Sequence, residues 1–198
     1  MTLNQFGAKP AVLRCSRCGK FVDWDEAQVQ VVCSCRPHID LPPVLVREAT
    51  DADRAAAREL FARDFGRTRI VAFGEVMDID AMPALVAIMY ADPSGALAYR
   101  LHGDALHIVA LATDPMWQRS GVGGHLVAEA ELLARRLGLT RLVVSTTNDN
   151  LPALYFYQRR GYRLTDLETN SIIAHTGRQV AGFAGIPVRD EVRLEKRL

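Results

Sequence analysis

Long apolar runs are missing from this sequence: no stretch approaches the roughly 20 residues that a membrane span requires. The opening residues, MTLNQFGAKP, also lack the apolar stretch of a secretory signal. An excess of one charge is missing too, because 24 Lys and Arg residues stand against 23 Asp and Glu, for a net charge of +1. We therefore expect a cytoplasmic protein with no membrane partner and no affinity for nucleic acid that rests on bulk charge.

Cysteine is absent from residues 36–198, since all four cysteines lie between residues 15 and 35. The segment 36–44, RPHIDLPPV, contains three prolines and has neither helical nor strand periodicity, which is typical of a linker. A length of 198 residues suits one full domain with a small appendage. We place the boundary near Pro42, which gives a cysteine-containing segment at 1–42 and one domain at 43–198.

The cysteines form two close pairs, C-x-x-C and C-x-C. Four thiolates can close a tetrahedral structural site, so the segment predicts a zinc-ribbon-like module with one zinc ion. A segment this short cannot bury enough surface to fold alone, so the metal would supply its stability. Free or redox-active thiols, disulfides, and His38 in place of one cysteine are the alternatives left open. The expected ligands are Cys15, Cys18, Cys33 and Cys35.

Few basic residues accompany these cysteines. Between residues 13 and 37 the basic side chains are those of Arg14, Arg17, Lys20 and Arg36. This is a thin electrostatic footprint for a nucleic-acid site, so we do not expect nucleic acid as a partner. A protein-docking module, or a structural flap beside a cleft of the larger domain, are the roles that remain for the segment.

Residues 43–198 show the periodicities of an α/β fold with a mixed sheet. A strand at 44–48 and a helix between Asp53 and Gly66 come first, and the segment 67–82 fits no single pattern. Three strand-like runs follow, separated by the turn pairs Pro93-Ser94 and Gly103-Asp104, so we expect antiparallel neighbours. A strand–helix–strand pattern then predicts a βαβ unit. The expected strands are 83–90, 95–103, 105–113, 139–147, 162–167 and 188–196, and the expected later helices are 122–137 and 150–160.

A glycine-rich loop joins the third of these strands to a helix in the stretch LATDPMWQRSGVGGHL, residues 111–126. Glycines let a ligand approach the backbone, and the first helical turn presents free N–H groups with a positive dipole end. Residues 118–124 therefore predict an anion site, with Arg119 as an added cation. A dinucleotide fingerprint is excluded because residue 126 is Leu, and the Gly-Lys-Ser/Thr of a P-loop is absent. A turn that only packs helix on strand is the remaining alternative.

The spacing Gln118-x-x-Gly121-x-Gly123 resembles the acetyl-CoA loop of the GNAT superfamily of N-acetyltransferases. A second block, NDNLPALYFYQRRGYRL at 148–164, is similar to that superfamily's Asn-x-x-Ala-x-x-(Leu/Phe)-Tyr-x-(Arg/Lys)-x-Gly-(Phe/Tyr) segment. The resemblance covers about residues 44–198. It implies a GNAT-like acyl-CoA N-acyltransferase fold with acetyl-CoA as the co-substrate.

The resemblance also implies roles for individual residues. The strand from Leu111 to Thr113 would offer backbone groups to the pantetheine arm, and Asn150, with Ala153 one turn further, would lie on the pantetheine side. A plain helix cap is the other interpretation of Asn150. Tyr157 would donate a proton to the departing CoA thiolate as a general acid, with an amphipathic core tyrosine as the alternative. The pyrophosphate would be held by backbone N–H groups of Gln118, Arg119, Ser120, Gly121, Val122, Gly123 and Gly124.

The proton acceptor for the reaction is unassigned by the sequence. Acetyl transfer to an amine needs a neutral nucleophile, whereas an ammonium pKa of about 10.4 leaves very little neutral amine at pH 7. Many relatives place a Glu on the strand that here reads ALHIVALAT, and this run contains no carboxylate. His107 is a candidate base, and a water chain or an acceptor of lower pKa are alternatives. The acidic residues Glu75, Asp78 and Asp80 either line the acceptor pocket or form a solvated loop.

The resemblance to the GNAT superfamily therefore implies an acetyl-CoA-dependent N-acetyltransferase that acetylates a primary amine of a small molecule or peptide. Direct transfer in a ternary complex is expected, because the domain at 43–198 has no cysteine to carry an acyl intermediate. The alternative is a non-catalytic adaptor or sensor that binds acetyl-CoA and carries the zinc-ribbon-like segment. Dimers are common among proteins that resemble this chain, so a homodimer is left open, and the sequence does not decide the oligomeric state.

Overall fold

The computed structural model describes residues 13–14, 21–25, 30–32 and 44–198. The chain divides into two compact units, residues 1–41 and 42–198. In the first unit, β1 (Leu13–Arg14), β2 (Phe21–Asp25) and β3 (Gln30–Val32) form an antiparallel sheet with β2 in the centre. The four cysteines and His38 lie outside the described residues, so the zinc site stays a prediction.

A seven-stranded mixed sheet forms the centre of the second unit, as the sequence predicts. Its strand order is β11-β14-β10-β9-β8-β7-β4, and β9 and β10 are its parallel pair, while the other neighbours are antiparallel. Its strands are β4 (Leu45–Glu48), β7 (Ala84–Met89), β8 (Asp92–His102), β9 (Ala105–Thr113), β10 (Arg141–Thr147), β11 (Arg163–Glu168) and β14 (Glu191–Arg197).

Four α-helices accompany the sheet in the part of the chain that the structure describes. They are α1 (Arg54–Phe65), α2 (Val122–Arg136), α3 (Leu151–Gln158) and α4 (Ser171–Thr176). Short 3-10 helices are η1 (Asp51–Asp53), η2 (Ile79–Ala81), η3 (Pro115–Trp117) and η4 (Phe183–Gly185), and two small hairpins are β5 (Arg69–Ala72) with β6 (Glu75–Asp78) and β12 (Val180–Ala181) with β13 (Pro187–Val188). None of the described helices is long and apolar enough to cross a membrane.

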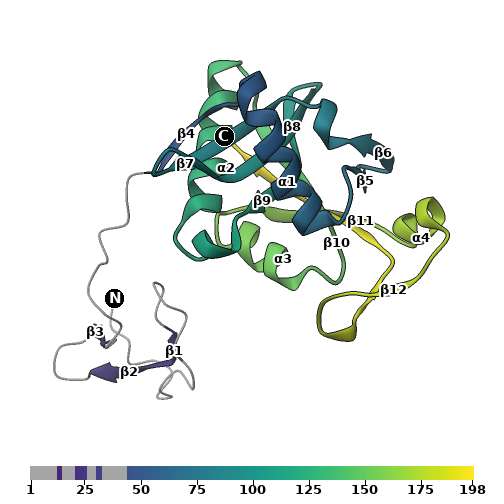
Figure 1. Cartoon of the computed structure of the whole chain (residues 1–198). Helices are drawn as coiled ribbons and strands as arrows, with labels where there is room; N and C mark the ends of the chain where they lie inside the picture. The colour runs from purple at the N-terminus through teal and green to yellow at the C-terminus, as the bar shows by residue number, and fades with distance from the viewer. Residues whose placement is uncertain (1–12, 15–20, 26–29, 33–43) are drawn as a thin grey trace. The chain divides into compact units, whose positions relative to one another are not determined.

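Helices α1 and α2 cover opposite faces of the sheet (Figure 1). Side chains alternate between the faces along each strand, so that Leu97 packs with α2 while Ala96 and Ala98 pack with α1. The core on the α2 side also contains Tyr157 of α3. Burial on both faces explains why the central strands read as nearly continuous apolar runs.

The fold differs from the sequence prediction at one turn and contains elements that the prediction left undefined. The turn between β7 and β8 lies at Tyr90-Ala91 and not at Pro93-Ser94, which are already part of β8. Tyr90 and Ala91 have φ values of 50° and 73°, a backbone region that favours glycine, so no turn residue marks the position. The ambiguous segment 67–82 forms the β5–β6 hairpin followed by η2. Helix α4 was not predicted.

Candidate active site

The parallel strands β9 and β10 separate halfway along their length. Their register pairs run from Ala105 with Arg141 to Ile108 with Val144 and end there. Beyond that point β9 continues beside β8 to Thr113, and β10 continues beside β14 to Thr147. The facing backbone edges of residues 109–113 and 145–147 therefore have no strand partner. Such edges suit an extended ligand that carries amide groups.

A β-bulge lies where the two strands separate. Ala98 of β8 pairs with Ala110, whereas the next residue, Tyr99, pairs with Ile108, so Val109 is the extra residue of β9. Both Val109 and Ala110 consequently pack on the α1 side of the sheet. Bulges increase the local twist and redirect backbone groups, and here the bulge helps to turn β9 away from β10.

The glycine-rich loop leads directly from the end of β9 into α2. Arg119 and Gly121 have φ values of 66° and 101°, and Gly121 is the N-cap of α2. The first intrahelical bond is donated by His125 N to Gly121 O at 3.1 Å. The N–H groups of residues 122–124 thus form the free end of the helix, where the dipole favours an anion.

The predicted anion-site residues are brought together with the end of β9. A Cβ atom placed on Gly123 would lie 3.5 Å from Leu111 Cδ2 and 3.4 Å from the Phe156 ring, so the helix start, strand and α3 pack closely. Arg119 and Gln118 are exposed, and Ser120 bonds back to Trp117 O. Trp117 itself packs on the core of the α2 side, next to Tyr90.

Asn150 begins α3 and acts as its cap. Its Oδ1 atom accepts a hydrogen bond from Ala153 N at 3.2 Å. Among residues 44–198, its side-chain nitrogen has no hydrogen-bond partner and remains free to donate to a ligand. The capping role is present, and it leaves the second predicted role of Asn150 intact.

Tyr157 lies in the core on the inner side of α3, with 5% of its surface exposed. Its ring packs edge-on against Tyr162 at a centroid distance of 5.3 Å. Burial raises the pKa of the Tyr157 hydroxyl well above its usual value of 10. Its hydroxyl has no hydrogen-bond partner within residues 44–198. The group therefore keeps its proton at neutral pH, as a general acid must.

His107 lies on the α1 side of β9, close to where the strands separate. Its ring stacks on Phe73 of the β5–β6 turn at 4.2 Å, and Arg100 Nε lies 3.4 Å from its Nδ1. Burial lowers the pKa of His107 to about 4, with smaller contributions from the charges of Arg100, His102, Arg141 and Arg193. Because a guanidinium only donates, this contact assigns the hydrogen of the neutral ring to Nε2. His107 is thus arranged as a neutral donor and poorly suited as a base.

The sequence does not indicate that Glu191 is a buried residue beside the candidate site. It is fully buried on β14, opposite Thr147 of β10. Its Oε1 accepts a bond from Arg193 Nε at 2.7 Å and its Oε2 accepts one from Gly74 N at 2.9 Å. Glu191 therefore fixes the β5–β6 turn to the sheet beside the separated strands. The alternating pattern of the last strand indicates a half-buried strand but not a buried carboxylate.

The acidic residues of segment 67–82 have partners of their own. Glu75 pairs with Arg100 at 3.2 Å, Asp80 pairs with Arg58 at 2.8 Å, and Asp78 caps η2 by accepting from Asp80 N. Three residues with separate structural tasks do not form one acidic lining. These contacts favour the interpretation of Glu75, Asp78 and Asp80 as a solvated, ion-paired segment.

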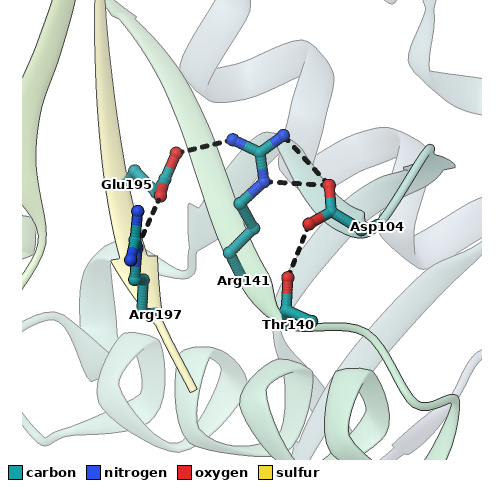
Figure 2. Close-up of a pocket in the computed structure, with 5 residues that line it drawn as sticks. All are labelled: Asp104, Thr140, Arg141, Glu195 and Arg197. Carbon is teal, nitrogen blue, oxygen red and sulfur yellow. Dashed lines mark hydrogen bonds and ion pairs between the residues drawn. The ribbon is translucent and has the colours of Figure 1, made fainter.

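A charged hollow lies at the other end of the parallel pair (Figure 2). Arg141 stands between Asp104 and Glu195, at 3.0 Å and 2.8 Å, and Thr140 donates to Asp104. Asp104, Thr140 and Arg141 lie at the amino ends of β9 and β10, and Glu195 lies on the last part of β14, away from the loop at 118–124. Because its charges are already paired, the hollow is a structural ion-pair network. Among the described residues no cluster of three or more potential metal ligands occurs.

Comparisons with known proteins agree with this geometry. The model of the acetyltransferase (GNAT) family matches residues 56–162. The Bacillus subtilis protein YxbD is 36% identical over 110 residues, which cover 52% of this chain and 67% of YxbD. An IAA acetyltransferase from Bacillus cereus has a similar structure, with a TM-score of 0.64 at 21% identity over 79% of this chain and 100% of that chain. A GNAT family acetyltransferase from Elizabethkingia anophelis with acetyl-CoA bound has a TM-score of 0.60 at 21% identity, over 78% of this chain and 98% of that chain.

Proposed function

Because the chain belongs to the acetyltransferase (GNAT) family, we propose that it transfers the acetyl group of acetyl-CoA to a primary amine of a small molecule or peptide. Transfer would be direct, within a ternary complex of protein, acetyl-CoA and amine. The separation of β9 from β10, next to the free helix end at 122–124, is the observation that carries this proposal. It offers unpaired strand edges for a pantetheine arm and N–H groups for its pyrophosphate in one continuous site.

The reaction uses few protein groups. The amine nitrogen attacks the thioester carbonyl, a new C–N bond forms, and the C–S bond breaks as the electron pair returns to sulfur. Tyr157 donates its proton to the thiolate, the proton lost by the amine leaves through water, and water returns a proton to Tyr157. No cysteine occurs between residues 43 and 198, so this domain supplies no thiol for a covalent acyl intermediate.

The acceptor would approach from the α1 side, where Phe73, His107 and Glu191 surround the point of separation. The β9 bulge turns two successive residues toward this side. His107 Nε2 is a donor in the neutral ring and would orient the acceptor or the carbonyl by a hydrogen bond. Glu191 accepts hydrogen bonds from Gly74 N and Arg193 Nε, which hold its carboxyl group beneath the β5–β6 turn, on the side from which the acceptor would approach.

The test of this function is release of CoA from acetyl-CoA with a panel of primary amines. Tyr157→Phe should lower kcat by about 100-fold or more, because the general acid is lost, and should leave acetyl-CoA binding intact. Tyr155→Phe is the matched control, since Tyr155 lies on the same helix with 62% of its surface exposed. Tight acetyl-CoA binding without turnover on any amine would instead favour the non-catalytic sensor or adaptor.

The N-terminal cysteines support a second part of the proposal. The pairs at residues 15 and 18 and at residues 33 and 35 have the ligand chemistry of a closed, structural Zn²⁺ site. We infer that the full chain holds one zinc ion there, and that the metal takes no part in acetyl transfer. The metal takes no part because a site with four thiolate ligands has no open coordination position for a substrate or a water molecule.

A further inference from the structure

Arg160 follows α3 and is held in one orientation by its neighbours. Its guanidinium carbon lies 3.7 Å from the centroid of the Phe156 ring, a close cation–π contact. Its Nη1 also donates a hydrogen bond to Phe156 O at 3.0 Å. The side chain is half-buried and is fixed before any ligand arrives. The sequence patterns alone indicate no role for this residue.

The guanidinium of Arg160 rests against the free end of α2. A Cβ atom built on Gly124 would lie 2.7 Å from Arg160 Nη2, closer than real side chains approach. Gly124 is the third residue of α2, in the turn whose N–H groups lack intrahelical acceptors. Because Gly124 has no side chain, the guanidinium of Arg160 can lie next to the predicted anion site.

The charge of Arg160 has no counter-ion among residues 44–198. Arg193, by comparison, pairs with three carboxylates, and Arg141 pairs with two. Glu131 acts on Arg160 at longer range, but both of its oxygens are bound to Lys196 Nζ at 2.8 Å. A partly buried cation without an anion is costly, and its cost is offset when an anionic ligand binds.

We propose that Arg160 binds a phosphate group of CoA, together with the N-terminal N–H groups of α2, and that Gly124 makes this contact sterically possible. The inference rests on the proposed function, because it assigns a further residue to the same CoA site. Two groups of CoA have the required chemistry, the pyrophosphate and the 3′-phosphate. A guanidinium can donate two parallel hydrogen bonds to either one.

The experiment measures the dissociation constant of CoA by calorimetry with the full-length protein. Arg160→Gln should raise the Kd for CoA about 10-fold or more, as expected for loss of charge-assisted hydrogen bonds. Arg159→Gln is the matched control: it removes the same charge one residue away, where Arg159 contacts Tyr155. Thermal unfolding of each variant establishes that it is folded.

The variant Gly124→Ala distinguishes loss of the contact between Arg160 and CoA from loss of folding stability. Alanine is the better helix former, and the atom that must move is the end of a flexible side chain, so stability should be kept or raised. Affinity for CoA should nevertheless fall, because the methyl group displaces the guanidinium. When Gly124→Ala is added to Arg160→Gln, the affinity for CoA should decrease little further, because the contact of Arg160 is already lost. Full additivity of the two effects would contradict the proposed contact.

Dephospho-CoA, which lacks the 3′-phosphate, identifies the group that is bound. If Arg160→Gln weakens CoA but leaves the Kd of dephospho-CoA unchanged, the 3′-phosphate is the partner. If it weakens both equally, the pyrophosphate is the partner, and either result supports the proposal. Equal CoA affinity of wild type and Arg160→Gln overturns the inference alone. Failure of the wild type to bind CoA overturns the proposed function as well.

Discussion

At the scale of single residues, burial gives Tyr157 and His107 their protonation states. Desolvation penalises the charged form of each group, so it raises the pKa of the tyrosine and lowers that of the histidine. Both side chains are therefore neutral at pH 7. A neutral tyrosine retains the proton that it is proposed to donate, whereas a neutral histidine beside Arg100 retains its hydrogen on Nε2.

The pKa of His107 has a consequence for stability. Its folded value of about 4 lies below the ordinary value of 6.5, so between these pH values the unfolded chain binds the additional proton. The stabilisation is thus fully present above pH 6.5 and is lost as the pH falls through 4. We expect urea unfolding to show this loss as the pH falls from 6.5 to 4. Over this interval the free energy of unfolding of the wild type should decrease by on the order of 2 kcal/mol more than that of His107→Phe. Parallel curves for the two proteins would contradict the assignment.

At the scale of elements, the β12–β13 hairpin is attached to the end of β10 by two side chains. Asp149 is buried and accepts a bond from Phe183 N at 3.0 Å, and Asn148 bonds to Pro187 O, Arg189 N and Asp190 N. Gly182 lies against the Asp149 carboxylate without space for a Cβ atom. The hairpin is consequently fixed within a few residues of Asn150, the start of α3.

Gly182→Ala should detach this hairpin while the sheet remains folded. The added methyl group collides with the Asp149 carboxylate and with Val188, so the bond from Phe183 N should be lost. Trypsin should then cut after the exposed Arg178 several-fold faster, at a rate that follows local opening. Gln179→Ala changes an exposed side chain of the same segment and should leave the rate unaltered. Equal cutting of both variants would show that Gly182 is not part of the attachment.

The order of elements could be predicted from the sequence because it depends on local patterns. Gly66 ends α1 in the left-handed conformation with φ 68°, and the contiguous motifs around Gly121 and Asn150 mark the starts of α2 and α3. The β5–β6 hairpin could not be recognised, because its turn uses Phe73 at φ 56° where glycine or asparagine is usual.

The candidate site has a signal in the sequence only where its residues are contiguous. The loop at 118–124 and the block that begins at Asn150 each contain their own signal. Glu191 and Arg160, in contrast, acquire their positions from the tertiary structure, since one is bound to Gly74 and the other rests on Gly124. Contacts between distant segments leave no periodic pattern in either segment.

At the scale of the whole molecule, we expect each of the two units to bind its own ligand, zinc in the N-terminal unit and acetyl-CoA in the second. Native mass spectrometry of the full chain should show one zinc ion and, after addition of acetyl-CoA, a 1:1 complex. Cys15→Ser should lose the zinc adduct because a four-thiolate site needs all of its ligands. A Cys15→Ser protein that keeps one zinc ion would exclude Cys15 as a ligand. Absence of the complex at about 100 µM acetyl-CoA, far above typical affinities for cellular substrates, would contradict the site at 118–124.

The short parallel pairing of β9 with β10 also affects cooperativity. Strands β4, β7, β8 and β9 form one half of the sheet and β10, β14 and β11 the other, and only four register pairs join the halves. Such halves are natural units of partial unfolding, with the joint as the place where opening begins. A ligand that forms hydrogen bonds to the edges of both β9 and β10 would connect the two halves of the sheet. Part of its binding free energy would stabilise the junction between the two halves, so that they unfold together as one cooperative unit.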